Sequence, residues 1–132
     1  MIYLASDHAG FELKNQIKSY LEEELNLEAE DMGAHEYTPE DDYPHFIIPA
    51  ARKVGERPDT NKGIVLGGSG QGEAIAANKI KGVRALLYYG GPLDIVKLSR
   101  EHNNANVLSL GARFLNEKEA KEALENYKKL NI

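Results

Sequence analysis

Residues 63–79 read GIVLGGSGQGEAIAANK, an apolar run followed by a glycine-rich loop and a segment of good helix formers. Residues 63–66 are typical of a buried strand, and residues 74–79 are typical of a helix. A strand, a glycine loop and a helix in this order form an anion site, because glycines let backbone amides approach a ligand and the helix N-terminus adds unpaired N–H groups. Glu73 stands at the mouth of this site, where a carboxylate serves either as a helix cap or as a base.

Length and composition indicate one globular domain over residues 1–132. Hydrophobic residues make up 42% of the chain and charged residues 28%, and the formal net charge is −5. This acidic balance argues against a nucleic-acid or membrane partner, although a local positive site can still bind a phosphate. There is no cysteine, which excludes disulfides and thiol catalysis. No signal-like segment follows Met1 and no apolar run reaches transmembrane length, so we expect a cytoplasmic protein.

Short apolar runs alternate with helix-forming segments along the chain. We expect strands over residues 1–5, 27–32, 63–66, 83–89 and 107–110, and helices after Gly10, Pro44, the glycine loop, Pro92 and Asn116. The alternation predicts an α/β fold with a parallel sheet and helices on both faces. Such folds bind ligands at the carboxyl ends of the strands, where the winding direction reverses. If strands 1–5 and 63–66 are neighbours there, Asp7 and His8 face the glycine loop.

The glycine loop differs from three familiar motifs. A P-loop requires lysine and then serine or threonine after its last glycine, whereas Glu73 and Ala74 follow Gly72. A dinucleotide fingerprint needs the spacing GxGxxG, and GSGQG is one residue too short. A nucleophile elbow needs GxSxG, and Gln71 stands where its last glycine belongs.

What remains is a loop of amides beside a carboxylate, a pair suited to proton abstraction next to a carbonyl group. Glu73 would take a proton from carbon while the loop amides stabilise the enediolate that forms. The alternative is that Glu73 only fills the first helical turn, where an acidic side chain contributes about 0.3–1 kcal/mol. Motif chemistry alone leaves both interpretations open.

Four motifs at matching spacing give the sequence a family resemblance. Asp7-His8-Ala9-Gly10, Asp42-Tyr43-Pro44, the stretch from Gly67 to Lys79 and the REHNNA segment at residues 100–105 closely resemble the ribose-5-phosphate isomerase B family, which includes the galactose-6-phosphate isomerase subunits. The resemblance implies a Rossmann-like three-layer α/β/α sandwich with a five-stranded parallel sheet. It also implies a homodimer or a dimer of dimers with shared active sites. The implied reaction is aldose–ketose interconversion of a phosphosugar, without a metal or an organic cofactor.

The resemblance also implies roles for single residues. The family has two versions of its base: a cysteine directly after the third strand, where this chain has Gly67, and a glutamate at the start of the next helix, which Glu73 matches. Ser69 matches a hydroxyl that helps to move protons between O1 and O2, and His102 matches the acid/base of ring opening. The positions that match substrate contacts are Asp7, His8, Tyr43, Gly68, Ser69, Gly70, Gln71, Gly72, Asn103 and Arg113, with residues 68–72 as the anion hole and Arg113 as a phosphate ligand.

His102 tests the idea of a shared site. It falls at the end of a helix that returns toward the amino ends of the strands, away from its own glycine loop. We therefore expect His102 and Asn103 to serve the pocket of a neighbouring subunit.

The resemblance fails near the C-terminus, where family members commonly carry two arginines that bind the phosphate and this chain has no arginine after Arg113. Arg113, His8 and a lysine are then the groups left for the phosphate.

A second cluster of polar residues has a simpler explanation. No standard metal-ligand spacing is matched by the polar residues of this segment, which are typical of a solvated loop rather than a metal site: His35, Glu36, Asp41, Asp42 and His45.

The leading hypothesis is the interconversion of ribose 5-phosphate and ribulose 5-phosphate. A six-carbon phosphosugar, such as allose 6-phosphate or galactose 6-phosphate, is an alternative substrate. A phosphosugar-binding protein without turnover is the alternative class.

Overall fold

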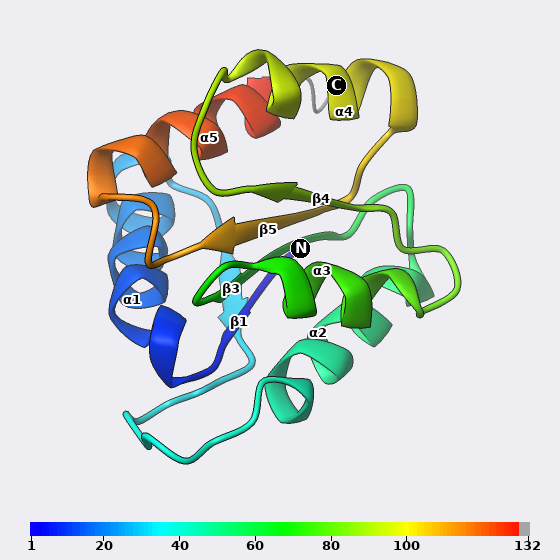
Figure 1. The fold of residues 1–132 in the computed structure, drawn as a ribbon. Coiled ribbons are helices and arrows are strands. Elements are labelled where there is room, and N and C mark those ends of the chain that lie inside the picture. Colours follow the sequence, from blue (N-terminus) through cyan, green and yellow to red (C-terminus); the bar gives the residue numbers. More distant parts are fainter. Residues whose placement is uncertain (130–132) are drawn as a thin grey trace.

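The computed structural model describes residues 1–129, and its centre is a five-stranded sheet (Figure 1). The strands are β1 (Ile2–Ser6), β2 (Ala29–Asp31), β3 (Lys62–Gly67), β4 (Ala85–Tyr88) and β5 (Val107–Gly111). They lie in the order β2-β1-β3-β5-β4, and neighbouring strands are parallel throughout. The predicted α/β class and the five-stranded parallel sheet are confirmed.

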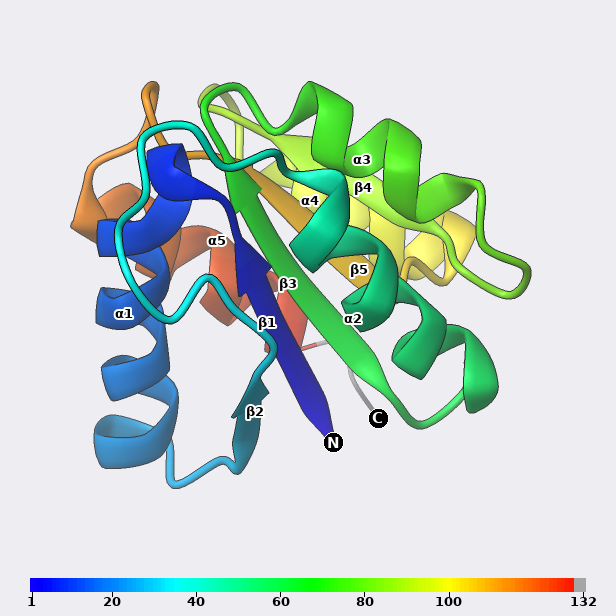
Figure 2. The ribbon, with the colours of Figure 1, turned by 90° about the horizontal axis from the view of Figure 1, so that it is seen from below.

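Helices cover both faces of the sheet (Figure 2). The α-helices are α1 (Phe11–Ser19), α2 (Pro44–Glu56), α3 (Gln71–Asn78), α4 (Asp94–Asn103) and α5 (Glu117–Lys129). α2 and α3 pack on one face, and α1, α4 and α5 pack on the other. Alternate strand residues serve the two faces: Ile64 and Leu66 join the core beneath α1, α4 and α5, whereas Val65 joins the core beneath α2 and α3. Within residues 1–129, none of the helices has the length and apolarity that crossing a membrane requires.

Some elements begin or end a few residues away from their predicted positions. The apolar stripe after Gly10 forms α1 and continues as a π-helical turn, η2 (Tyr20–Glu24), and a short 3₁₀ turn, η1 (His8–Gly10), precedes α1. The strand expected over residues 27–32 is shorter and lies at the sheet edge, in keeping with its acidic sequence. α3 begins at Gln71 rather than at Ala74, because Gly70 adopts a positive φ and ends the loop there. Glu73 is therefore the third residue of a helix.

The winding direction reverses between β1 and β3, which are neighbours in the sheet. Their register runs from Ile2 opposite Lys62 to Ser6 opposite Leu66. β1 is followed by Asp7 and β3 by the glycine loop, so both segments lie at the carboxyl edge of the sheet. Asp7 and the glycine loop therefore lie next to each other, as the sequence predicted for neighbouring strands.

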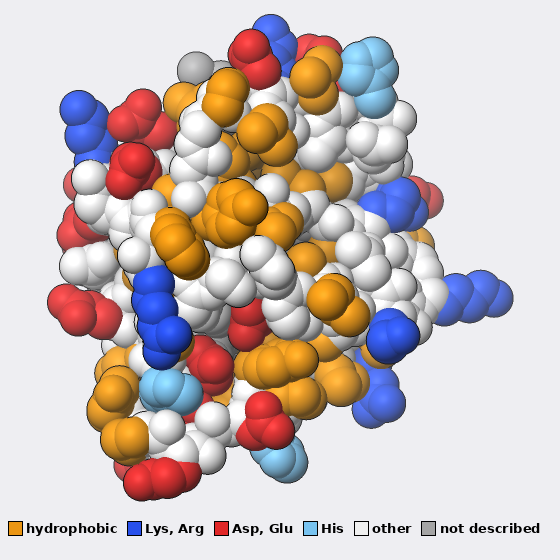
Figure 3. Space-filling model, in the orientation of Figure 1, with side chains coloured by type: hydrophobic (Ala, Val, Ile, Leu, Met, Phe, Trp, Pro, Cys, Tyr) orange, Lys and Arg blue, Asp and Glu red, His pale blue; other side chains and the backbone are white. Residues whose placement is uncertain are grey.

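Hydrophobic side chains are also found outside the core. They gather on the face that carries α3 and α4 (Figure 3). Ile95 and Leu98 on α4 are each 46% exposed, and Ile75 on α3 is 61% exposed. The rings of Tyr89 and Phe114, both largely exposed, meet edge-on with centroids 5.6 Å apart. Exposed hydrophobic patches of this kind are typical of surfaces that bind another protein.

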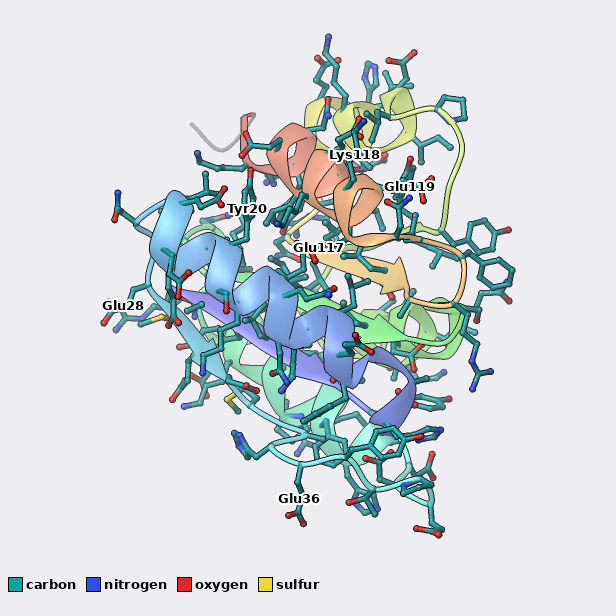
Figure 4. All side chains as sticks on the ribbon, turned by 90° about the vertical axis from the view of Figure 1, so that its left-hand side faces the viewer. Tyr20, Glu28, Glu36, Glu117, Lys118 and Glu119 are labelled. Atoms are coloured by element: carbon teal, nitrogen blue, oxygen red, sulfur yellow. The ribbon has the colours of Figure 1, made fainter. Side chains whose placement is uncertain are left out.

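α1 and α5 lie side by side, although they come from opposite ends of the sequence (Figure 4). Tyr20 Oη donates a 2.5 Å hydrogen bond to Glu125 Oε1, and this bond raises the pKa of Tyr20 to about 12. Lys121 Nζ lies 5.0 Å from the centre of the Tyr20 ring. α5 begins with the predicted capping arrangement, in which Glu119 N donates to Asn116 Oδ1 at 2.8 Å and Asn116 N donates to Glu119 Oε1 at 3.0 Å.

One lysine side chain lies wholly inside the protein. Lys14 Nζ donates to Asp31 Oδ1 at 2.7 Å, to Asp31 Oδ2 at 2.9 Å and to the carbonyl oxygen of Ala34 at 2.5 Å. Its three N–H donors therefore all have acceptors. Burial acts to raise the pKa of Asp31, but the hydrogen bonds from Lys14 and Gly33 and the lysine charge outweigh burial, so this pKa is lowered. The ion pair ties α1 to the end of β2.

Candidate active site

The glycine loop between β3 and α3 is held through its carbonyl groups. Gly68 O accepts a hydrogen bond from Arg113 N at 3.0 Å. Gly70 O accepts a 2.7 Å bond from the buried hydroxyl group of Ser109 on β5. Because these carbonyl groups are directed to β5 and the segment after it, the loop amides other than that of Gln71 remain as the groups available to a ligand.

Close packing requires two of the glycines. Gly70 has a φ of +79°, and a Cβ at this position would lie 2.8 Å from Leu87 Cδ1. A Cβ on Gly111, at the end of β5, would lie 2.5 Å from the carbonyl oxygen of Ser69. Bare backbone at both positions lets the loop lie directly on the end of β5. The N-terminus of α3 then lies at the same edge of the sheet.

Glu73 lies in the first turn of α3 with its carboxyl group folded back over Gly67. The residue is 4% exposed, and a Cβ at position 67 would overlap the carboxyl group. Burial raises the pKa of Glu73; a hydrogen bond from its own backbone amide opposes the shift, and the nearby charge of Asp7 adds to it. Within residues 1–129, no lysine, arginine or histidine forms a salt bridge with Glu73. A buried carboxyl group of this kind is typical of a base rather than of an exposed helix cap.

Asp7 and His8 form the opposite wall, at the end of β1. Asp7 Oδ1 accepts hydrogen bonds from Ala9 N at 3.0 Å and from Gly10 N at 3.4 Å, and so caps η1. His8 donates its backbone N–H to Asp41 Oδ1 at 2.9 Å, and its ring atom Nδ1 lies 2.8 Å from the same oxygen. The loop that precedes α2 is thereby attached to the end of β1.

These groups enclose a cavity of about 240 Å³ at the junction of β1 and β3. Tyr43 lies over Gly72, where an added Cβ would be 2.8 Å from the tyrosine ring. Arg113 lies over Gly68, where an added Cβ would be 3.2 Å from Nη1. The lining residues are Asp7, His8, Ala9, Tyr43, Gly68, Ser69, Gly72, Glu73 and Arg113. Apart from Ala9, each of them belongs to the site predicted from the sequence.

The remaining predicted site residues lie outside this cavity. Gly70 is buried beneath the loop, and Gln71 is exposed, with its backbone amide donating to Ser69 Oγ at 3.2 Å. His102 and Asn103 are exposed at the end of α4, which runs back toward the amino edge of the sheet (Figure 1). Within one chain, the structure therefore does not bring His102 to Glu73, as the direction of its helix predicted.

Asp7, His8 and Asp41 place ligand atoms within 4.8 Å of one another, an arrangement that could hold a metal ion. Asp41 comes from the loop that was predicted to be solvated. That prediction holds for Glu36, which projects away from the protein (Figure 4), but it is wrong for Asp41, whose side chain is only 10% exposed. The Asp41 carboxylate is engaged by His8, so the three groups form a hydrogen-bonded cluster in this structure.

Two residues that hold the site in place were not recognised from the sequence. Ser109 holds the Gly70 carbonyl group, and Asp41 holds His8. Ser109 does leave a signal, since it is the polar residue in the otherwise apolar strand VLSLG. Asp41 leaves none, because its contact with His8 spans 33 positions of the chain and follows no periodic pattern.

A glycine loop, a buried carboxyl group and two basic side chains around one cavity are typical of an enzyme that acts on a small anionic substrate. Comparison with known proteins agrees. The ribose/galactose isomerase family model matches residues 2–132. The chain is 50% identical to ribose-5-phosphate isomerase B of Mycolicibacterium paratuberculosis over 113 residues, which are 86% of this chain and 69% of that protein. It is 38% identical to the probable ribose-5-phosphate isomerase B of Mycoplasma genitalium over 131 residues, 99% of this chain and 84% of that protein.

Solved structures agree with this result. The crystal structure of ribose-5-phosphate isomerase B from Mycoplasma genitalium with bound ribulose-5-phosphate matches with a TM-score of 0.92 at 38% identity, covering 97% of this chain and 82% of that one. The enzyme from Clostridium thermocellum matches with a TM-score of 0.87 at 37% identity, covering 97% and 83%. The chain therefore belongs to the ribose/galactose isomerase family. The predicted family and the predicted class of enzyme, a sugar-phosphate isomerase, are confirmed.

Proposed function

We propose that this chain interconverts ribose 5-phosphate and ribulose 5-phosphate, with Glu73 as the base. The observation that carries the proposal is the position of the Glu73 carboxyl group, buried over Gly67 beside the glycine loop. The relatives named as ribose-5-phosphate isomerases, and the Mycoplasma genitalium structure with bound ribulose-5-phosphate, support this pair of sugars.

The reaction moves one proton between neighbouring carbon atoms of the open-chain sugar. Glu73 removes the proton from C2 of the aldose, and the electron pair forms the C1–C2 double bond of an enediolate while charge moves to O1. Amides of residues 68–72 stabilise that charge, and one such donor contributes about 3–4 kcal/mol. The protonated Glu73 then returns the proton to C1. The raised pKa suits both steps, because the same group must take up the proton and give it back.

The hydroxyl groups of the sugar need partners of their own. Ser69 lines the cavity with Glu73, and we assign its hydroxyl group to the transfer of the proton from O2 to O1. Asp7 and Tyr43 line the same cavity and would bind sugar hydroxyl groups. This proton transfer requires a hydroxyl oxygen that can both accept and donate a proton within hydrogen-bond distance of the sugar.

The phosphate group of the substrate is assigned to His8 and Arg113. Both side chains line the cavity, and the guanidinium group of Arg113 lies over Gly68. A guanidinium group can bind two phosphate oxygens at once, which places the phosphate as well as attracting it. The phosphate would thus lie across the cavity mouth, next to the loop amides.

A second copy of the chain would complete the site. One face of α4 carries Ile95, Leu98 and His102, which are three and four positions apart and so lie on the same side of the helix. This face belongs to the exposed hydrophobic surface in Figure 3. A two-fold symmetric contact through that surface would carry His102 and Asn103 to the Glu73 of the partner. His102 would then assist ring opening there. We propose a homodimer, or a dimer of dimers, on this basis.

Turnover measurements test the reaction. Wild type and Glu73→Gln are assayed with ribose 5-phosphate, allose 6-phosphate and galactose 6-phosphate. We expect wild type to favour ribose 5-phosphate and the variant to lose about 10²–10⁴-fold in kcat, the contribution of a positioned general base. No turnover of any of the three sugars by wild type would defeat the enzyme proposal. Equal rates in the variant would remove Glu73 as the base, and preference for a six-carbon sugar would favour the alternative substrate.

Mixing two inactive variants tests the shared site. In a mixed dimer of Glu73→Gln and His102→Ala, one site carries both substitutions and the other carries neither. Random exchange of subunits should therefore restore up to about one quarter of the wild-type activity. No recovery, with mixed dimers shown to form, would mean that Glu73 and His102 of different chains do not act together.

A further inference from the structure

We propose that Asp41 is a positioning residue for His8, which fixes the imidazole ring so that Nε2 is the nitrogen offered to the substrate. Asp41 Oδ1 accepts the backbone N–H of His8 at 2.9 Å and lies 2.8 Å from Nδ1 of the same residue. The backbone and the ring of His8 are thus held by one oxygen atom. The ring cannot turn about its side-chain bonds without losing the contact at Nδ1.

The carboxylate of Asp41 is committed to His8. Its side chain is 10% exposed, and Oδ2 is buried without a hydrogen-bond partner in residues 1–129. It does not cap the helix that follows, because the N-cap residue of α2 is Tyr43 and no side chain caps that end. A buried carboxylate is costly unless N–H donors hold it, and here His8 supplies them. The contact therefore serves His8 rather than a helix end.

A second side chain of the same loop holds the ring from another direction. The ring of Tyr37 meets the His8 ring edge-on, with centroids 6.2 Å apart, and meets Phe11 at 6.3 Å. Edge-on contacts of aromatic rings favour one relative orientation. The loop before α2 thus restrains the imidazole both by a hydrogen bond and by packing.

The chemistry of the two partners decides which nitrogen is free. An ionised carboxylate accepts hydrogen bonds and cannot donate one, so Nδ1 must carry a proton. In a neutral ring Nε2 is then the acceptor, and in an imidazolium ring Nε2 carries the second N–H. In both states Nε2 is the atom left for a ligand: in the neutral ring it accepts a hydrogen bond from a sugar hydroxyl group, and only in the imidazolium ring does it donate to a phosphate oxygen. His8 lines the candidate cavity together with Arg113. This inference rests on the proposed function, in which His8 contacts a phosphosugar.

The variant Asp41→Asn tests the inference, because it keeps the size of the side chain and removes its charge. An asparagine amide can offer its oxygen to Nδ1–H or its NH₂ group to a bare Nδ1, so both tautomers of a neutral ring become available. The ¹⁵N chemical shifts of the His8 ring should show the Nδ1–H tautomer in wild type and a mixture in the variant. KM for ribose 5-phosphate should rise about tenfold, by analogy with the loss seen when the partner that orients a metal-binding imidazole is removed. kcat should stay within about twofold, because the reacting groups are untouched.

Glu40→Gln is the matched control, since it neutralises an exposed carboxylate one residue away on the same loop. It should change neither the ring shifts nor KM. A single Nδ1–H tautomer in Asp41→Asn, or an unchanged KM, would overturn the inference. A fall in kcat at constant KM would also overturn it, because the effect would then lie in the chemical step.

Failure of the isomerase proposal can be told apart from failure of this one. A wild-type protein without turnover defeats the isomerase, whereas the His8 shifts and the calorimetric affinity for ribose 5-phosphate still report on Asp41. Affinity about tenfold weaker in Asp41→Asn supports the positioning role. Equal affinity in the two proteins, or binding by neither, counts against it.

Discussion

The Lys14–Asp31 pair and the carboxyl group of Glu73 both lie inside the protein, close to the carboxyl edge of the sheet. Lys14 is completely buried, yet each of its N–H donors has an acceptor. Glu73 is almost as buried, but no basic side chain pairs with it within residues 1–129. The pKa of Asp31 is lowered because its lysine partner outweighs burial, whereas the pKa of Glu73 is raised because burial dominates.

Burial alone does not determine what an ionisable group does; its hydrogen-bond and charge partners do. A buried pair whose hydrogen bonds are complete fixes one element against another, and removing one member is severe. A buried carboxyl group without a cation is less stable in its charged form, so its pKa is raised. These partners favour a structural role for Lys14 and agree with the chemical role that we propose for Glu73, and four experiments test the contrast.

The largest expected effect separates activity from stability at Glu73. Glu73→Gln should lower kcat by about 10²–10⁴-fold while the protein stays folded, because the amide fits the same space but takes no proton. Steady-state kinetics and circular dichroism measure the two quantities. Glu12→Gln is the control, since Glu12 is an exposed acidic residue in the first turn of α1. Equal losses in both variants would mean that first-turn charge, not base chemistry, is being measured.

The opposite pattern is expected at Lys14. Lys14→Met leaves the Asp31 carboxylate, whose side chain is 11% exposed, without its buried hydrogen-bond donor, and the free energy of unfolding should fall by about 3–5 kcal/mol in urea titrations. Lys18→Met is the control, because Lys18 Nζ lies 3.9 Å from Asp31 Oδ2 but its side chain is 37% exposed. The control should lose no more than about 1 kcal/mol. If Lys14→Met also lost no more than about 1 kcal/mol, the Lys14–Asp31 pair would not have the structural role that distinguishes it from Glu73.

Gly67→Ala tests whether the space above residue 67 belongs to the Glu73 carboxyl group. The added methyl group overlaps that carboxyl group, so Glu73 must move and kcat should fall by about 10²-fold, the effect of a small misplacement in an active site. Gly63→Ala on the same strand adds a methyl group 3.1 Å from Val107 Cγ2 and Val54 Cγ2, away from the cavity. It should reduce stability without a selective loss of kcat. Full activity in Gly67→Ala would contradict the placement of Glu73.

The smallest effect is the pH dependence of stability, and its sign differs between the two groups. The pKa of Glu73 is raised in the folded protein, so stability is lost as pH rises through that pKa. At pH 7 the free energy of unfolding of Glu73→Gln should therefore exceed that of wild type by about 0.5–2 kcal/mol. The difference should vanish below the ordinary pKa range of glutamate. The pKa of Asp31 is lowered, so Asp31→Asn should lose stability at pH 7 and approach wild type as pH falls through the folded pKa. Urea titrations from pH 3 to 8 that gave the same sign for both variants would undo the comparison.

Periodicity and glycine placement were enough to predict the fold. Alternating strands and helices gave the parallel sheet, and the position of the glycine loop after residues 63–66 placed the site at the carboxyl edge. Most of the cavity lining was also predicted, because Asp7, Tyr43 and Glu73 occupy motif positions. Local patterns suffice where a residue's role follows from its own element.

Two contacts between distant segments could not be predicted. The burial of Lys14 depends on Asp31, at the end of β2, and on the carbonyl group of Ala34, in the turn that follows. Asp41 looked like one acidic residue of a polar loop until the fold brought it to His8. A lysine in an amphipathic helix and an aspartate in a loop are ordinarily exposed, so only the tertiary arrangement distinguishes these two.

Gly67 has no side chain, and the space that a side chain would fill there is taken by the carboxyl group of Glu73, six residues further along the chain. A side chain at 67 and a carboxyl group at 73 compete for one volume, so the preferred residue at either position depends on the other. Substituting a cysteine at 67 while Glu73 remains crowds the site, and replacing Glu73 first removes the proposed base. Because the two positions are in contact, substitutions at them should not be additive, and an engineered exchange of the reactive group should change both positions together.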